Sequence, residues 1–174
     1  LKSMGFRGEA LSSIASVSHL TVISNQNITE DLGFKIKIEG GKLVENEEVL
    51  LKKGTTVSVE NLFFNIPARR NFLKSDNVEL RHIIDEFHRA SLVNHNINFV
   101  FLNNGNELFN LNKSIFKERI IRIFGKSVNE KLVPIKEITD FVKIDGFIFK
   151  PEFSRKTKST QFFFVNNIGK FIWL

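Results

Sequence analysis

The sequence of 174 residues contains no cysteine, only three prolines and no apolar run of membrane-spanning length. Without cysteine, neither a disulfide scaffold nor a thiolate zinc site can form, and the chain suits a reducing compartment. The longest apolar runs, such as residues 162–165, have the length of a strand, well short of the roughly 20 residues of a membrane helix. The first residues do not combine a basic segment with an apolar one, so they do not indicate a signal peptide.

The chain also lacks an initiator methionine, and it ends on the apolar residues 171–174. We therefore expect both ends to be cut from a longer protein. The 42% of hydrophobic residues is typical of a globular chain and argues against disorder. Lys and Arg (25) outnumber Asp and Glu (19), and the net charge of +6 modestly favours an anionic partner.

The periodicity of apolar residues predicts a mixed α+β fold. Helical spacing indicates helices over residues 9–19, 68–73, 76–94 and from 114 to 125. Alternation indicates strands over residues 20–24, 34–38, 43–51, 54–62, 99–102, 108–111, 131–138, 141–150 and 160–166. We expect the first four strands to form an antiparallel meander, and Asn104-Gly105 to form a type I′ hairpin turn. A domain boundary is expected near residues 112–114.

Two glycines, Gly5 and Gly8, stand three residues apart before the first expected helix. Backbone N–H groups beside such glycines and at a helix start can bind phosphate, and Arg7 could add a charged contact. A plain glycine turn with a solvated Arg7 is the alternative. The pattern is neither a Walker A loop nor a dinucleotide fingerprint. Gly54-Thr55 could place a hydroxyl beside a base, although a strand that simply begins at glycine is the plainer explanation.

Basic residues offer several candidates for phosphate contact. Arg69 and Arg70 either bind phosphate or form structural salt bridges. The loop with Arg155, Lys156 and Lys158 is typical of a contact to a nucleic-acid backbone. A basic helical segment is expected to be a solvated face, with contact to nucleic acid as the alternative; it contains Lys117, Arg119, Arg122 and Lys126.

No complete active site emerges from the residue pattern. His82 and His88 lie six residues apart on one expected helix, which does not fit a metal-binding spacing, so we expect them on a solvated face. No Ser-His-Asp order and no paired carboxylates stand out.

Two long blocks resemble the MutL DNA mismatch-repair family. Residues 5–17 resemble its GFRGEAL–SIASV motif, and residues 54–73 resemble its GTTV…LFxNxPARRxFL block. Asn104-Gly105, residues 122–125 and residues 164–166 match weaker landmarks, so the resemblance runs over the whole chain. It places the chain in the GHKL ATPase superfamily.

The resemblance implies an α+β architecture in two parts. Residues 1–112 would form the C-terminal part of a GHKL (Bergerat) ATPase α/β sandwich, and residues 113–174 the start of a ribosomal-S5-domain-2-like transducer domain. The implied ATP-binding residues are Gly5, Phe6, Arg7, Gly8, Glu9, Ala10, Leu11, Thr55 and Thr56. The implied DNA-binding residues are Arg155, Lys156, Lys158 and Lys170, while Arg69 and Arg70 stay structural or phosphate contacts.

Several functional residues of the family fall outside this chain. Its general-base Glu, its Mg²⁺-binding Asn and its adenine-binding motif precede residue 1, and its phosphate-sensing Lys follows residue 174. We therefore expect no catalytic or metal-binding residue here and no ATP turnover by the chain alone. In addition, Ile168 stands where the family's FVNGR strand end has Arg, with Lys170 nearby.

The resemblance implies an ATP-dependent matchmaker or clamp that couples mismatch recognition to downstream strand processing. ATP and Mg²⁺ would be its cofactors. DNA, a mismatch-recognition protein of the MutS type and a second copy joined through the ATPase region would be its partners. It would work without a membrane, in the bacterial cytoplasm at the nucleoid or in a eukaryotic nucleus. The alternatives are another GHKL ATPase, gyrase B-like or chaperone-like, and a non-enzymatic basic module that binds nucleic acid.

Overall fold

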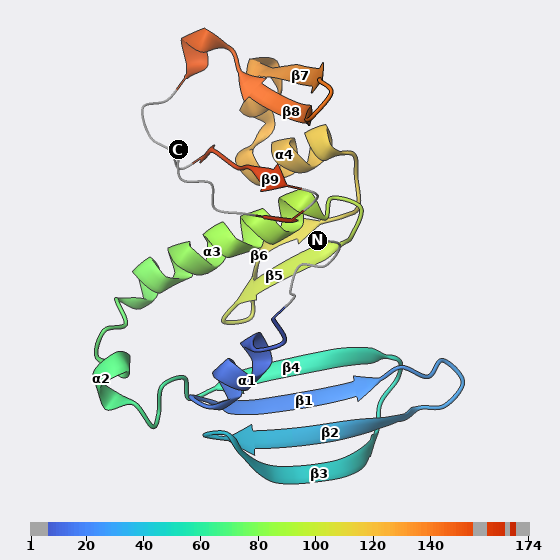
Figure 1. Ribbon diagram of the computed structural model, residues 1–174, viewed down its shortest axis with the longest axis vertical. Coiled ribbons are helices and arrows are strands. Elements are labelled where there is room, and N and C mark those ends of the chain that lie inside the picture. The colour runs from blue at the N-terminus through green and yellow to red at the C-terminus, as the bar shows by residue number, and fades with distance from the viewer. Residues whose placement is uncertain (1–6, 155–159, 166–167, 170–174) are drawn as a thin grey trace. The chain divides into compact units, whose positions relative to one another are not determined.

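The computed structural model describes residues 7–154, 160–165 and 168–169 (Figure 1). The chain forms two compact units, one within residues 5–79 and one within residues 80–174. Both combine helices with antiparallel strands, as the α+β prediction requires. Within the described ranges, no helix is both long enough and apolar enough to cross a membrane.

The first unit is a four-stranded antiparallel sheet with two short helices. It contains α1 (Ala10–Ala15), β1 (His19–Asn25), β2 (Leu32–Glu39), β3 (Lys42–Leu50), β4 (Gly54–Glu60) and α2 (Pro67–Arg70). The strand order is β3-β2-β1-β4 (Figure 1). The helix expected over residues 9–19 ends earlier, at Ala15, and β1 already begins at His19.

The prediction of a four-strand meander is wrong, because β4 pairs with β1 instead of β3. The connection from β3 to β4 crosses the ends of β2 and β1 and is held there by two hydrogen bonds. The backbone N–H of Leu51 donates to the carbonyl of Asp31 (3.0 Å). The side-chain amide of Asn25 donates to the carbonyl of Leu51 (2.7 Å). These contacts direct β4 to the far edge of the sheet.

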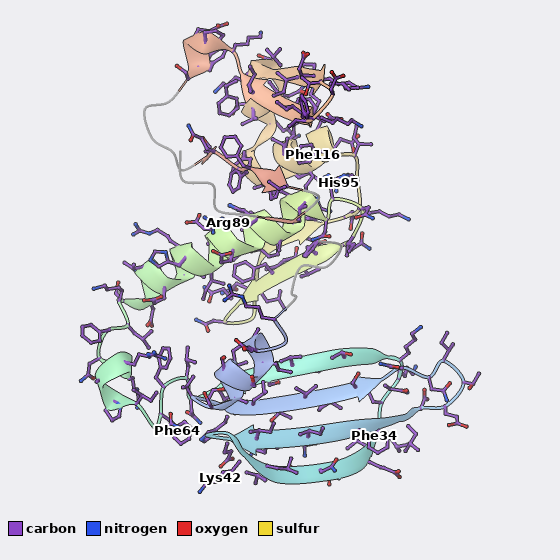
Figure 2. All side chains as sticks on the ribbon, in the orientation of Figure 1. Phe34, Lys42, Phe64, Arg89, His95 and Phe116 are labelled. Carbon is purple, nitrogen blue, oxygen red and sulfur yellow. The ribbon has the colours of Figure 1, made fainter. Side chains whose placement is uncertain are left out.

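One face of this sheet is apolar, because side chains at alternate positions of a strand point the same way. Leu20 of β1 lies opposite Ile38 of β2 and Val59 of β4. Leu20 and Ala15 of α1 are buried and form the core of the unit. Farther along the same face the sheet is open, and Phe34 is 56% exposed (Figure 2).

The opposite face carries ion pairs, some between β2 and β3 and one within β2. The Lys35 ammonium lies 2.7 Å from Glu45 and 3.0 Å from Glu47, and the Lys37 ammonium lies 2.8 Å from Glu39. The hydrogen bond with Glu45 raises the pKa of Lys35, and the same bond lowers the pKa of Glu45. Both groups therefore stay charged at neutral pH, and this face is polar.

The second unit contains most of the long helix α3 (Asp76–Val93), which confirms the helix predicted over residues 76–94. The unit continues with β5 (Phe99–Asn103), β6 (Asn106–Leu111), α4 (Phe116–Phe124), a 3₁₀ helix (Lys126–Lys131), β7 (Leu132–Ile138), β8 (Lys143–Phe149), a 3₁₀ turn (Pro151–Phe153), β9 (Phe164–Val165) and β10 (Ile168–Gly169). Of the strand expected over residues 160–166, the described part is extended only at β9.

Aromatic side chains join α3 to the hairpin of β5 and β6. The ring of Phe87 stacks on Phe101 (5.0 Å between centroids) and on Phe109 (5.3 Å), and these two residues face each other in the hairpin register. The turn residues Asn104 and Gly105 have φ values of 50° and 79°. Positive φ at both positions is the geometry of a type I′ turn, so the predicted turn is confirmed.

The remaining elements pack through further aromatic pairs. Phe116 of α4 lies 5.8 Å from the ring of His95 (Figure 2) and 5.9 Å from Phe147 of β8. Helix α4 ends at Gly125, whose φ of 95° few other residues adopt. The hairpin of β7 and β8 thereby rests against α4.

Candidate functional site

The expected phosphate-binding segment leads directly into α1. Gly5 and Phe6 lie outside the described residues, whereas Arg7, Gly8 and Glu9 are exposed. Gly8 has a φ of 70°, and a Cβ added there would meet no atom within 4 Å. Glu9 is the N-cap of α1 and makes no side-chain capping hydrogen bond. The segment therefore offers open space around a backbone that glycine allows to turn.

The rest of α1 is exposed apart from its last residue. Ala10 and Leu11, which complete the predicted ATP-binding segment, form its first turn on the solvent side. The first N–H groups of any helix have no acceptor within the helix, and they can serve a ligand. Ala15, at the other end, is 4% exposed. The helix is thus packed at its end and open at its start.

Thr55 and Thr56 lie on opposite faces of β4, because neighbouring strand residues alternate. Thr55 pairs in register with Ser24 of β1, and their hydroxyl oxygens are 2.8 Å apart. Thr55 shares the face that carries Leu20, whereas Thr56 pairs with Ile23 and lies on the other face. Of the two predicted threonines, only Thr55 belongs to the apolar side of the sheet.

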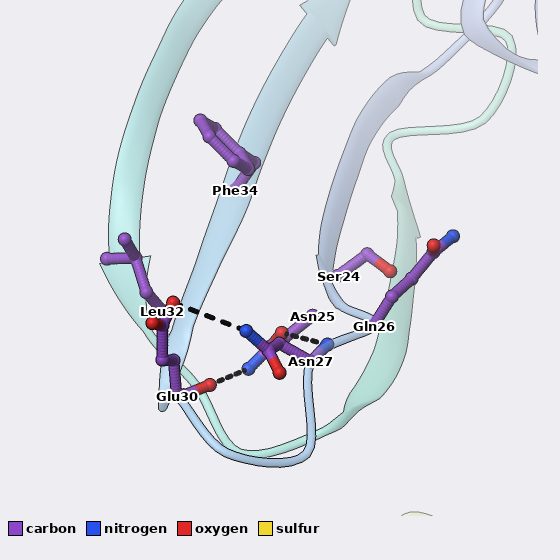
Figure 3. Close-up of a pocket in the computed structure, with 7 residues that line it drawn as sticks. All are labelled: Ser24, Asn25, Gln26, Asn27, Glu30, Leu32 and Phe34. Atoms are coloured by element: carbon purple, nitrogen blue, oxygen red, sulfur yellow. Dashed lines mark hydrogen bonds between the residues drawn. The ribbon is translucent and has the colours of Figure 1, made fainter.

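Ser24 also borders a cavity of about 490 Å³ at the same end of the sheet (Figure 3). The cavity is lined by Ser24, Asn25, Gln26, Asn27, Glu30, Leu32 and Phe34. Asn25 is 5% exposed and holds the loop: its side-chain amide donates to the backbone carbonyl of Glu30 (2.8 Å), and its oxygen accepts from the N–H of Asn27 (2.7 Å). The cavity therefore combines a loop fixed by hydrogen bonds with the open side chain of Phe34.

The arginines of α2 are both exposed. The guanidinium of Arg69 lies over the ring of Phe63, 5.6 Å from its centroid, a cation–π contact. Arg69 therefore has a structural partner, and neither arginine is paired with an acidic residue among the salt bridges of the described chain. The predicted DNA-binding residues Arg155, Lys156, Lys158 and Lys170 lie outside the described residues.

The prediction that Arg119 lies on a solvated face is wrong, because its side chain is fully buried. Arg122 and Lys126 of the same basic segment are exposed, as expected. The four backbone carbonyls around Arg119 accept its N–H groups and replace water as hydrogen-bond partners: Ser91 (2.9 Å), His95 (3.0 Å), Ile97 (2.7 Å) and Asn112 (3.2 Å). Basic composition alone could not distinguish this structural arginine from its solvated neighbours.

The prediction that His88 is solvated is also wrong. Its ring packs edge-on against Phe109 (5.3 Å) and Phe124 (5.5 Å), and burial lowers its pKa from 6.5. His82 is exposed, as predicted. In the described part of the chain, no three His, Asp or Glu side chains gather as a metal site would require.

The family model for "DNA mismatch repair protein, C-terminal domain" matches residues 120–168. The DNA mismatch repair protein MutL of Flavobacterium psychrophilum is 59% identical over 167 residues, which is 96% of this chain and 27% of that protein. The MutL of Bacteroides fragilis is 45% identical over 166 residues, 95% of this chain and 26% of that protein. The chain thus spans about a quarter of the length of these relatives.

Two solved structures are similar to the fold. The Aquifex aeolicus MutL ATPase domain complexed with ADP has a TM-score of 0.66 at 31% identity, covering 78% of this chain and 57% of that one. The N-terminal domain of a DNA repair protein has a TM-score of 0.83 at 25% identity, covering 98% of this chain and 57% of that one. The predicted fold, part of a GHKL ATPase domain followed by the start of a transducer domain, is confirmed. The chain belongs to the MutL family of DNA mismatch repair proteins.

Proposed function

We propose that this chain supplies part of the nucleotide-binding machinery of an ATP-dependent mismatch repair protein. The full-length protein would act as a clamp that couples mismatch recognition to downstream strand processing. The observation that carries the proposal is the similarity, over 78% of the chain, to a MutL ATPase domain complexed with ADP. The open glycine segment before α1 is compatible with a phosphate ligand, since nothing lies within 4 Å of a Cβ at Gly8.

Individual residues receive separate roles in this proposal. The segment Gly5–Leu11 holds the phosphates of ATP through its backbone N–H groups, with Arg7 adding positive charge. Thr55, whose hydroxyl is fixed by Ser24 at 2.8 Å, assists recognition of the adenine, and Thr56 supports the same strand start. ATP supplies the free energy that drives the clamp between its states. The general base and the Mg²⁺ ligand come from parts of the protein outside this chain.

The partners follow from the same family membership. DNA binds through the basic residues Arg155, Lys156, Lys158 and Lys170, because positive side chains neutralise its phosphates. A mismatch-recognition protein of the MutS type recruits the clamp, and a second copy joins it through the ATPase region when ATP is bound. The named relatives are bacterial, and this supports a location at the bacterial nucleoid.

The domain assignment, residues 1–112 and 113–174, is also part of the proposal. The hydrogen bonds of Arg119 to Ser91 and Asn112 connect the two sides of position 113. In this assignment, these hydrogen bonds join the transducer domain, which begins at residue 113, to the ATPase domain.

ATP hydrolysis by the full-length protein tests this function. Gly8→Val places a β-branched residue at a φ of 70° and fills the space for phosphate, so turnover should fall at least tenfold. Gly105→Val is a matched control, since Gly105 has a φ of 79° and equally open surroundings, and it should retain turnover. Equal ATPase rates in Gly8→Val and the wild type would contradict the proposal. If the affinity of the full-length protein for DNA depends on salt but does not change with ATP, a non-enzymatic module that binds nucleic acid would be favoured instead.

A further inference from the structure

The carbonyl oxygens of residues 15–18, from the last residue of α1 to the residue before β1, all accept hydrogen bonds from other segments of the first unit. The donors and acceptors are Gly41 N–H to Ala15 O (2.9 Å), Asn65 Nδ2 to Ser16 O (2.9 Å), Phe63 N–H to Val17 O (2.7 Å) and Gly40 N–H to Ser18 O (3.1 Å). The carbonyl of Ala15 lies in the last turn of α1 and has no N–H donor within the helix. Two remote segments, the turn between β2 and β3 and the chain after β4, supply the donors for this carbonyl and for the three that follow it.

These donors are held in backbone conformations that the surroundings must stabilise. Gly40 and Gly41 have φ values of 55° and 82°, and Phe63 reaches 62° without being glycine. A positive φ costs a residue such as phenylalanine about 1–2 kcal/mol. Packing is tight as well, since a Cβ on Gly40 would come within 3.3 Å of the Phe64 ring and 3.4 Å of Asn65 Nδ2. The turn and the segment after β4 thus form one close-packed support.

A ring contact extends the support beyond the backbone. Phe64 lies edge-on to His19, with 4.5 Å between the centroids, and Asn61 Nδ2 lies 3.1 Å from His19 Nδ1. His19 is the first residue of β1 and follows the end of α1 by four positions. The junction between α1 and the sheet is therefore held by hydrogen bonds and by aromatic packing.

The start of α1 differs sharply from this end. Residues 7–14 are exposed, and the open surroundings of Gly8 contrast with the crowded Gly40. A short helix that is fixed at its end holds its open first turn in a position set by that end. Among the four donors, only Asn65 acts through a side chain, so it can be replaced without altering the backbone.

We propose that Asn65 is a positioning residue for the nucleotide-binding segment Gly5–Leu11. Together with Phe63 and the Gly40–Gly41 turn, it anchors the end of α1, so that the start of the helix meets the ATP phosphates in one defined orientation. This role rests on the proposed function, because it requires ATP to bind at the start of α1. Asn65 does not itself contact the nucleotide, and it acts through the carbonyl of Ser16.

Asn65→Asp in the full-length protein tests the role. The carboxylate keeps the shape of the amide but cannot donate to Ser16, and it repels the carbonyl oxygen. We expect the affinity for the ATP analogue AMP-PNP to fall about tenfold in calorimetric titration. Hydrogen exchange of the α1 amides should accelerate, while exchange in β1 and β4 stays as in the wild type. Asn129→Asp, the same change at an exposed position of the 3₁₀ helix after α4, should bind AMP-PNP like the wild type.

The outcomes separate the two proposals. If Asn65→Asp binds AMP-PNP as tightly as the wild type and leaves α1 exchange unchanged, the anchor is overturned while the nucleotide site stands. If Gly8→Val also binds normally, the proposed function fails, and the anchor fails with it. If Asn65→Asp does not fold, hydrogen exchange of the wild-type protein tests the anchor instead. The N–H groups of Gly40, Gly41 and Phe63 should then be protected from exchange with and without AMP-PNP. Rapid exchange at these three amides would overturn the anchor.

Discussion

The guanidinium of Arg119 in α4 donates a hydrogen bond to the carbonyl oxygen of Ser91 in α3 across 2.9 Å, and both residues are 0% exposed. Further bonds reach the carbonyls of His95, Ile97 and Asn112. The positive charge lies at the C-terminal end of α3, where the helix dipole favours it. Burial and the nearby Arg122 lower the pKa of Arg119, but an arginine keeps its proton under all ordinary conditions. One side chain thus joins α3, the β5–β6 hairpin and α4.

Arg119→Met should destabilise the protein by about 3 kcal/mol, because several buried carbonyls lose their donor at once. Arg119→Lys should fall between methionine and the wild type, since an ammonium keeps the charge but has fewer donors. Urea unfolding of each variant measures the change. Arg122→Ala, at an exposed position of the same helix, should stay within about 0.5 kcal/mol of the wild type. A similar loss for Arg122→Ala and Arg119→Met would show that the buried bonds are not the cause.

Acid should weaken the second unit through His88. Burial between Phe109 and Phe124 lowers the pKa of His88 below 6.5, although Asp85 opposes the shift. His88 therefore takes up a proton at a higher pH in the unfolded chain than in the folded chain. As a result, the free energy of unfolding falls as the pH drops below about 6.5. At higher pH this contribution is constant.

His88→Phe removes the titrating group and should flatten this pH dependence between pH 8 and pH 5.5. Urea unfolding at several pH values provides the measurement. His82→Gln replaces an exposed histidine of the same helix and should keep the slope of the wild type. A pH dependence that persists unchanged in His88→Phe would assign it to other groups.

Gly105→Ala should cost about 1 kcal/mol, because the type I′ turn holds Gly105 at a φ of 79°. Gly146→Ala is a suitable comparison, since Gly146 lies within β8 at an ordinary φ, and a Cβ would meet nothing within 4 Å. Alanine there should be neutral or slightly stabilising. Thermal or urea unfolding distinguishes the pair, and equal effects of the two changes would argue against backbone strain at the turn.

Local signals in the sequence predict several elements correctly. The 3.6-residue spacing of apolar residues and the acidic start at Asp76 locate α3, and Asn104-Gly105 locates the hairpin turn. The same local signals do not predict which strands pair. Alternation predicts β4 but not its pairing with β1, which depends on a hydrogen bond between the distant residues Asn25 and Leu51.

It is equally hard to predict from the sequence pattern which side chains are buried. Arg119 and Arg122 lie in the same basic segment of the sequence, so the residues around them do not distinguish a buried arginine from an exposed one. Only the folded chain brings the carbonyls of Ser91 and Ile97 to the side chain of Arg119. In the candidate site, resemblance identifies the glycine segment and the threonines. It does not reveal the contact between Asn65 and Ser16, which are 49 positions apart in the sequence. Asn65 does lie in a block shared with the family, and that was the available signal.

In the proposed function, the glycine segment and the start of β4 contact ATP. Hydrogen exchange of the full-length protein, measured with and without AMP-PNP, tests it most directly. We predict that the nucleotide slows exchange at residues 7–13 and at residues 54–57, where Gly8 and Thr55 lie, and leaves the β5–β6 hairpin unchanged. Tight binding of AMP-PNP with no slowing at either segment would contradict the proposed contact with ATP.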